Sequence, residues 1–428
     1  MTVTDDIHRL FELDPEAIRC PYPAFARQRA EAPVEFIEET GVYLVTRYAD
    51  VMHVVRNPDV FSSRMPTGPH ATAELVRLVT ELAAESEEIR ALLASPKMSG
   101  ATAVLLSADP PDHPRQRMLV NRAFSPPRVK QIEEPIREIC KKLVDAFVDD
   151  GEVELVKQFA VPLPLTVIAG ALGVPADDLD TFKRWSDDFV VLVGNHRPPK
   201  ERIADYLRSR SEFADYFQAK VAERRAEPRD DLISDIVHAR IDGEELTVDE
   251  MLSMFSQFLV AGNETTTKHI TATMLMLIEH PDQLAKVRAD PSLIPNLVEE
   301  SLRLDTPVQG LYRTANLDTE VGGVAIPAGS HLMVMYASAN RDDAQYSEPE
   351  AFDVCRANAK THLAFSQGPH FCLGAALARS ESRIAIETLL ARLDDIALAP
   401  GKNTFEYEST YVLHGLTELH LTFTAAQS

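Results

Sequence analysis

Cys372 stands in a loop whose residue types suit a metal-binding thiolate. The loop runs from Phe365 to Gly374 and reads Phe-Ser-Gln-Gly-Pro-His-Phe-Cys-Leu-Gly. A long amphipathic helix is predicted directly after it, with Leu377 and Ile384 on one face. A helix N-terminus supplies amide donors and positive potential, and both stabilise a thiolate. The alternative is a cysteine that packs as a small buried hydrophobe, because most free cysteines do so.

The cysteine count narrows the kind of metal centre. No C-x-x-C pair occurs among the four cysteines, which are Cys20, Cys140, Cys355 and Cys372. This spacing argues against a zinc or iron–sulfur site and against a disulfide framework, and it favours a reducing compartment. A single thiolate can hold one iron if a macrocycle fills the in-plane positions. Gly368 and Gly374 would let the backbone approach such a flat group closely.

A second unusual stretch lies in a long predicted helix from Asp249 to Ile278. Thr247 and Glu250 form the T-x-x-E pattern of a capping box at its start, and Pro281 ends it. The apolar residues occur nearly all round this helix, which indicates burial in a large core.

The middle of this helix, residues 261–267, reads Ala-Gly-Asn-Glu-Thr-Thr-Thr. Gly262 costs roughly 1 kcal/mol relative to alanine in a helix interior. Burial of Glu264 without a partner would cost several kcal/mol, and adjacent threonines are poor helix formers. These penalties together indicate a functional use. The alternative is a solvated edge, which suits Asn263 and Thr267 better than the whole set.

The cysteine loop matches every fixed position of F-x-x-G-x-H-x-C-x-G, the haem-binding signature of the cytochrome P-450 family. The resemblance extends from about Pro15 to the C-terminus. It implies haem b as cofactor and Cys372 as the axial ligand of the haem iron. Further haem contacts are implied for residues at matching positions, which are Phe365, Ala261, Gly262 and Gly374.

The polar stretch of the long helix is similar to the family's oxygen-activation motif. The resemblance implies that Gly262 leaves room over the iron for dioxygen. Thr265 would hydrogen-bond the oxygen or the water that protonates it. Glu264 would relay protons from solvent as a positioned general acid. Many members have aspartate in place of Glu264, and this difference leaves the carboxylate role unchanged.

Charged residues supply the remaining parts of the resemblance. The two haem propionates need cationic donors, and four residues match the family pattern: His113, Arg117, Arg313 and His370. An E-x-x-R motif and a later arginine match a buried structural network behind the haem, formed by Glu300, Arg303 and Arg356. Taken singly, each of these residues reads as a surface charge or an exposed helix pair.

The expected fold is mainly α with small β-sheets. By resemblance it is the cytochrome P-450 fold, a triangular prism with haem between the long helix and the cysteine loop. One domain is expected over residues 1–428, with residues 1–14 poorly ordered. Strands are predicted at 34–36, 43–46, 321–326, 331–336 and 419–423, and helices at 48–56 and 73–93.

Composition limits the partners. The net charge of −23, from 43 basic and 66 acidic residues, argues against nucleic acid or an anionic membrane as the main partner. No apolar run approaches the ~20 residues of a membrane span. We therefore expect a soluble, cytoplasmic, monomeric protein.

The sequence carries no flavin or nicotinamide fingerprint. The electrons must therefore come from another protein, and the resemblance points to a ferredoxin with its ferredoxin reductase. A basic patch could receive this partner, formed by Arg379, Arg383, Arg122, Arg128 and Lys130. The alternative is a set of solvated surface charges.

The expected reaction is monooxygenation of a hydrophobic small molecule of the terpenoid, steroid, fatty-acid or polyketide type. The substrate pocket is expected to include Val308, Leu311, Phe258, Tyr411 and Val412. The break Gly194-Asn195-His196-Arg197-Pro198-Pro199 predicts a mobile access lid between two helices. One alternative is a peroxygenase driven by hydrogen peroxide, which the Glu264–Thr265 pair disfavours. Another is a haem sensor without turnover.

Overall fold

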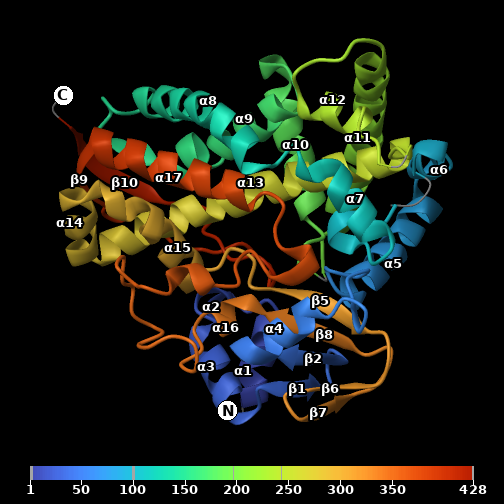
Figure 1. Cartoon of the computed structure of the whole chain (residues 1–428), viewed down its shortest axis with the longest axis horizontal. Helices are drawn as coiled ribbons and strands as arrows, with labels where there is room; N and C mark the ends of the chain where they lie inside the picture. The colour runs from blue at the N-terminus through green and yellow to red at the C-terminus, as the bar shows by residue number, and fades with distance from the viewer. Residues whose placement is uncertain (1–2, 99–101, 196, 242, 427–428) are drawn as a thin grey trace.

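A computed structural model describes residues 3–98, 102–195, 197–241 and 243–426. Most helices lie on one side of the molecule, and a sheet-rich region with the N-terminal helices lies on the other (Figure 1). The long helix α13 crosses the middle (Figure 1). The expected mainly α fold with small β-sheets is confirmed.

The helices of the first half are α1 (Val3–Phe11), α2 (Pro15–Arg19), α3 (Tyr22–Glu31), α4 (Tyr48–Arg56), α5 (Pro69–Glu85), α6 (Glu87–Leu93), α7 (Asp112–Asn121), α8 (Pro126–Asp145), α9 (Pro162–Ala171) and α10 (Leu179–Val190). Those of the second half are α11 (Lys200–Ala226), α12 (Leu232–Val237), α13 (Val248–Glu279), α14 (Pro281–Ala289), α15 (Ile294–Leu304), α16 (Tyr336–Ala339) and α17 (Ala375–Arg392).

Three small sheets complete the fold. The five-stranded sheet has the order β1-β2-β8-β5-β3, in which β2 and β8 are parallel and the other pairs antiparallel. A second sheet has the order β4-β10-β9, and β6 and β7 form a hairpin. The strands are β1 (Val34–Ile37), β2 (Val42–Val45), β3 (Phe61–Ser62), β4 (Glu152–Glu154), β5 (Gly310–Ala315), β6 (Thr319–Val321), β7 (Val324–Ile326), β8 (His331–Met335), β9 (Leu393–Leu398) and β10 (His420–Ala425).

Helix α13 agrees with its prediction to within one residue at each end. The Thr247 hydroxyl accepts a hydrogen bond from the Glu250 amide at 3.2 Å, and the Glu250 carboxylate accepts one from the Thr247 amide at 2.8 Å. This is the expected capping box, and it satisfies two of the free amides at the helix start.

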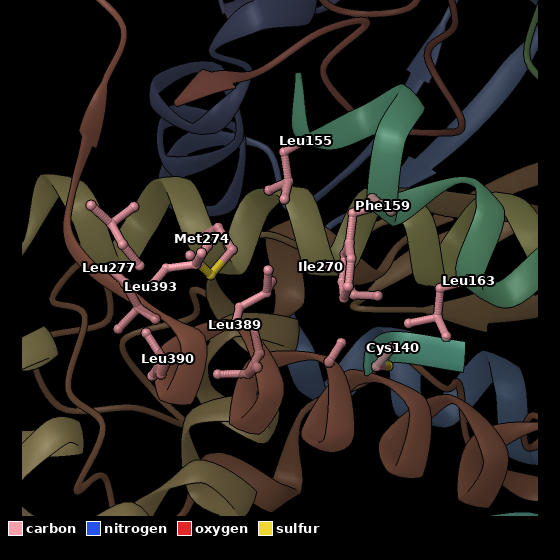
Figure 2. Packing of buried hydrophobic residues seen from close by; sticks show 14 of the residues in the cluster. Cys140, Leu155, Phe159, Leu163, Ile270, Met274, Leu277, Leu389, Leu390 and Leu393 are labelled. Carbon is pink, nitrogen blue, oxygen red and sulfur yellow. The ribbon is translucent and has the colours of Figure 1, made fainter. Parts of the chain in front are cut away.

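The core that fixes α13 lies against α17, α8 and the segment after β4. Figure 2 shows Ile270, Met274 and Leu277 of α13 among side chains from these elements. Leu389 of α17 and Phe159 are fully buried in the same cluster. Because α17 begins just after the cysteine loop, this packing sets that loop relative to α13.

The N-terminal segment contains a helix that the sequence analysis did not predict. Residues 3–11 form α1, and its apolar face packs into a core cluster with α3 and β2. Ile7, Leu10 and Phe11 are buried, so this burial stabilises a helix that the polar start of the sequence did not reveal. No helix within the described ranges is long and apolar enough to cross a membrane.

The break between α10 and α11 is held to the C-terminal loop. The Thr410 hydroxyl donates to the Val193 carbonyl at 2.8 Å, and the Tyr411 amide donates to the Gly194 carbonyl at 3.2 Å. Arg197 pairs with Glu12 at 2.9 Å. The role of the break at residues 194–199 as an access lid stays a prediction. His196 of this break, and also Ser99 and Gly100, lie outside the described residues.

Candidate functional site: a thiolate loop facing unpaired cationic donors

The Cys372 thiol lies at the N-terminus of α17. Its own amide donates to the Phe365 carbonyl at 2.9 Å, which closes the loop. The amides of Gly374 and Ala375 donate hydrogen bonds to the thiol. Burial raises the pKa of Cys372, while these two amides and the nearby Arg117 and Arg379 oppose that rise. The loop therefore offers a thiolate ligand the donors it needs.

The two loop glycines have different neighbours. Gly368 has φ +71°, and a Cβ there would lie 2.7 Å from the Val55 carbonyl of α4. Its need for glycine comes from packing on α4 rather than from a flat partner, which corrects that part of the sequence interpretation. A Cβ on Gly374 would have no described atom within 4 Å, so this side of the loop has room for a macrocycle.

The four predicted propionate donors form one cationic cluster. The rings of His113 on α7 and His370 in the loop lie 4.1 Å apart. Burial, and then Arg117, lower the pKa of His113. Burial lowers the pKa of His370 to about 3, with Arg313, His113 and Arg117 adding to it. These groups come from three segments of the chain, because His113 and Arg117 share α7, and the two arginines disfavour protonation of the two histidines.

The donors of this cluster fit an anionic group. The Nε2 atoms of His113 and His370 are buried and have no hydrogen-bond partner among the described residues. Arg313 is 2% exposed, and its guanidinium donates to the Tyr312 carbonyl at 2.7 Å. Buried polar atoms in proteins are nearly always hydrogen-bonded. Two carboxylates placed here would satisfy both ring nitrogens and offset the positive charge, so the residues fit a haem with its propionates.

The stretch of α13 from residue 261 to 265 is a polar segment within a continuous helix. The Thr265 hydroxyl donates to the Ala261 carbonyl at 2.9 Å and so competes for a helix acceptor. A Cβ on Gly262 would lie 3.4 Å from Ile168 of α9. This is an ordinary van der Waals distance, so packing on α9 does not by itself require glycine at this position. The role of Gly262 in leaving room for dioxygen stays a prediction.

Two neighbours assigned to a solvated edge are buried instead. Asn263 is 1% exposed, and its amide donates to the Ser186 hydroxyl at 3.1 Å. Thr267 is 6% exposed and donates to the Ala160 carbonyl at 2.9 Å. Polar partners on neighbouring elements make burial possible, and the sequence pattern does not reveal such partners.

Glu264 is held by an ion pair that the sequence interpretation missed. Lys268 Nζ lies 2.7 Å from Glu264 Oε2 and 2.9 Å from Glu408 Oε1. The Glu264–Lys268 pair could have been predicted from the sequence, because residues four apart face one another on a helix. The Lys268–Glu408 pair could not, since these two residues are 140 positions apart.

Glu300, Arg303 and Arg356 meet in a closed network. Both Glu300 oxygens accept from Arg303 at 2.8 Å, and Arg356 Nε donates to Glu300 Oε1 at 2.9 Å. Glu300 and Arg303 have no exposed side-chain surface. The remaining guanidinium donors bond backbone carbonyls, which include those of Asn340 and Pro349.

The expected substrate-pocket residues do not all lie together. Val308, Leu311, Tyr411 and Val412 belong to one apolar cluster. Phe258 belongs to a different cluster, around α10 and α11. Tyr411 and Val412 are 2% and 0% exposed, and the contact of these residues with a substrate stays a prediction.

Comparisons with known proteins agree with this geometry. The family model "Cytochrome P450" matches residues 183–403. Steroid C26-monooxygenase of Mycobacterium tuberculosis is 34% identical over 94% of the chain and 93% of its own length. Vitamin D(3) 25-hydroxylase of Pseudonocardia autotrophica is 37% identical over 94% of the chain and 93% of its own length. The crystal structure of CYP109E1 from Bacillus megaterium with corticosterone has a TM-score of 0.81 and 31% identity, and the match covers 95% of the chain and 99% of that structure.

The chain belongs to the cytochrome P450 family. It is a P450 monooxygenase, and its cofactor is haem b. Enzymes of this family act with redox partners. The thiolate loop and the cationic cluster give this P450 the residues that fit haem.

The arginines on the thiolate side of this P450 are largely paired. Arg379 binds Glu299 through two bonds of 2.6 and 2.9 Å, and its guanidinium lies 4.5 Å from the Phe365 ring. His362, unassigned from the sequence, lies with Nε2 3.3 Å from Glu299 Oε2. Burial acts to raise the pKa of Glu299, but these two partners outweigh it and hold it at about 2. Arg379 is therefore a structural cation.

Two other members of the predicted basic patch are also paired. Arg383 bonds Glu133 at 2.8 Å, and Arg128 bonds Asp230 at 2.6 Å. Arg122 and Lys130 are exposed. The acidic partners reduce the charge that the sequence alone assigned to this surface.

Glu381 on α17 is a buried acid that the sequence interpretation also missed. It is 2% exposed, and burial raises its pKa to about 8, although a hydrogen bond with Thr266 opposes the rise. The folded protein therefore holds this proton more tightly than the unfolded chain does. The stability that this group contributes is full below about pH 4.5 and is lost as the pH rises through 8.

Glu381→Gln is expected to stabilise the P450 increasingly as the pH rises between about 4.5 and 8. The amide keeps the neutral form, so its gain over wild type grows at up to ~1.4 kcal/mol per pH unit. Urea unfolding across this pH range measures the gain. Glu387→Gln, on the exposed side of the same helix, is the control with no such trend. Parallel curves for wild type and Glu381→Gln would contradict the assignment.

Proposed function

We propose that this P450 hydroxylates a hydrophobic substrate of steroid size, with electrons from a ferredoxin and its reductase. The observation that carries the proposal is the Cys372 thiol at the α17 N-terminus near Arg117, together with two adjacent buried histidines whose Nε2 atoms have no partner among the described residues. When bound there, haem activates dioxygen, so that one oxygen atom enters the substrate and the other leaves as water. The protein supplies the binding, the orientation and the protons.

Each proposed site residue has a separate task. Cys372 would ligate the haem iron, and a thiolate ligand supplies the electron density that favours O–O cleavage. His113, Arg117, Arg313 and His370 would hold the propionates, and Phe365 would contact the haem from the cysteine loop. The hydroxyl of Thr265 donates to the Ala261 carbonyl on α13. It would position a proton on the side of the site where dioxygen binds. Glu264 carries protons to that point from solvent.

The relatives support a steroid-like substrate. Two of them bear names that specify oxidation of a steroid or of vitamin D, and a solved structure holds corticosterone. Val308, just before β5, and Leu311, within β5, are half-buried apolar residues. We propose that they contact the substrate.

The sequence and the state of the cysteines also support a redox partner and a cellular location. No cofactor fingerprint for electron supply occurs in the sequence, so we propose a separate ferredoxin that docks on the thiolate side near Arg122 and Lys130. All four cysteines are free thiols, which supports a reducing, cytoplasmic location. We propose that the enzyme acts as a monomer.

Turnover of testosterone with ferredoxin, ferredoxin reductase, NADH and labelled dioxygen tests this function. The expected result is a hydroxylated product that carries one labelled oxygen atom, preceded by a shift of the haem band on binding. A product formed only with hydrogen peroxide would replace the proposal with a peroxygenase. A band shift with fatty acids but not with steroids would overturn the substrate class.

Thr265→Ala is expected to keep its haem but to divert reducing equivalents to hydrogen peroxide. The loss of a positioned proton donor lowers the product formed per NADH by about tenfold or more. Thr271→Ala is the matched control, because Thr271 makes the same hydroxyl bond to the carbonyl four residues earlier, at 2.9 Å. Equal coupling in Thr265→Ala and wild type would argue against this role.

A further inference from the structure

A buried lysine links the proposed proton-relay acid to the C-terminal loop. Lys268 lies one turn beyond Glu264 on α13 and is 2% exposed. Its ammonium bridges Glu264 Oε2 at 2.7 Å and Glu408 Oε1 at 2.9 Å. The lysine therefore connects the half-buried Glu264 to Glu408, whose side chain is 34% exposed.

The loop that carries Glu408 is shaped around this lysine. A Cβ on Gly415 would lie 2.3 Å from Lys268 Cγ and 2.9 Å from Lys268 Cδ. The aliphatic part of Lys268 therefore passes directly over the Gly415 backbone, where any larger residue would displace it. A buried ammonium has a high desolvation cost unless it is paired, and here two carboxylates pair with it.

The remaining groups around Glu264 leave one of its oxygens available. Oε2 is bound by Lys268, while the one contact to Oε1 from the described part of the chain is a long one of 3.4 Å from the Asn263 amide. From α10, Asp187 faces Glu264, and Lys183 faces Glu408 while pairing with Asp187. Oε1 is therefore the oxygen through which Glu264 can exchange a proton.

Removal of the ammonium would change the state of the acid. Glu264 and Glu408 would then be two carboxylates in one half-buried site with no shared cation. Like charges so placed favour protonation of one member. Glu264 would then lose the ion pair that orients its carboxylate.

We propose that Lys268 and Glu408 are positioning residues that hold the Glu264 carboxylate by its Oε2 and leave its Oε1 for proton exchange. This inference rests on the proposed function of Glu264 as the proton relay. Lys268 acts through Glu264 and does not itself touch substrate or cofactor. Glu408 acts one step further away by holding the lysine between the two carboxylates.

The first test is the coupling of turnover in Lys268→Met, with testosterone as the probe. Methionine keeps an unbranched chain over Gly415 but removes the charge. We expect wild-type haem content, about tenfold less product per NADH, and a displaced pH profile. Lys268→Arg should restore most of the coupling, and Glu408→Gln should lose part of it. Lys402→Met, which removes an exposed lysine 2.7 Å from Glu152, should match wild type.

The second test needs no turnover. The melting temperature of Lys268→Met should fall further below that of wild type at pH 8 than at pH 6, by ~2–4 °C or more. The difference arises because two uncompensated carboxylates repel each other only when both are ionised. Glu264→Gln combined with Lys268→Met should remove this extra loss, because one of the two charges is then gone.

The outcomes separate this inference from the proposed function. Wild-type coupling in folded Lys268→Met, together with uncoupling in Glu264→Gln, overturns the positioning role and leaves the relay in place. Wild-type coupling in Glu264→Gln overturns the relay itself. A melting difference that does not depend on pH overturns the charge argument, whatever the turnover shows. If Lys268→Met fails to bind haem, Lys268→Arg and Glu408→Gln decide by the same measurements.

Discussion

Cys372→Ala is expected to abolish monooxygenation and to remove the red-shifted absorbance of the ferrous–carbon monoxide complex. Both properties depend on a thiolate ligand, because its electron density favours O–O cleavage and sets the haem spectrum. Alanine keeps the backbone bond from residue 372 to the Phe365 carbonyl, so the loop should remain closed. Absorbance spectra of the reduced, carbon monoxide-treated protein measure the effect.

The other cysteines supply the controls for this experiment. Cys140 is fully buried in the α8–α17 core, and burial raises its pKa to about 12. Cys355 is exposed. Alanine at either position should leave the band where it is in wild type. A red-shifted band of full intensity in Cys372→Ala would show that the ligand assignment is wrong.

Arg303→Met is expected to destabilise the protein by ~3–5 kcal/mol, because it leaves the buried Glu300 with half of its cationic partners. It also strips buried donors from the carbonyls of Asn340, Pro349 and Ala351. These carbonyls belong to the segment after α16 that leads to the thiolate loop, so haem binding should weaken as well. Urea unfolding and haem content measure the two effects.

An exposed pair with the same spacing is the control for Arg303. Arg77 and Glu74 are also three residues apart on a helix, but Arg77 is 53% exposed. Because solvent screens such pairs, Arg77→Met should leave the unfolding midpoint close to that of wild type. The unfolding midpoint of Arg303→Lys should lie between those of Arg303→Met and wild type. Lysine keeps the positive charge but cannot make the two parallel hydrogen bonds of the guanidinium to Glu300. Equal midpoints for Arg303→Met and wild type would contradict the network.

Local sequence patterns predicted the elements that carry the site. Helix α4 lies at its predicted residues 48–56, and α13 differs from its prediction by one residue at each end. The capping box of α13 and the Glu300–Arg303 pair depend on spacings of three residues, which the geometry of a helix turns into contact. Patterns of this kind need no knowledge of the rest of the fold.

Contacts between distant segments were not predictable in this way. Asn263 and Thr267 are buried because Ser186 and Ala160 lie beside them. Gly368 is required by the approach of α4, and the basic patch is weakened by Glu133, Glu299 and Asp230. In each case the deciding partner lies far away in the chain, so neither propensity nor periodicity identifies it.

The sequence by itself determined the thiolate loop, the polar stretch of the long helix and the spacing of the charged motifs. These depend on residues within a few positions of one another, whose distances follow from local backbone geometry. Only the tertiary structure decided that His113 and His370 lie together, that Glu408 reaches Lys268, and that β2 lies beside β8. Such pairings are set by the packing of the whole chain, because many segments compete for each buried surface and the global fold selects among them.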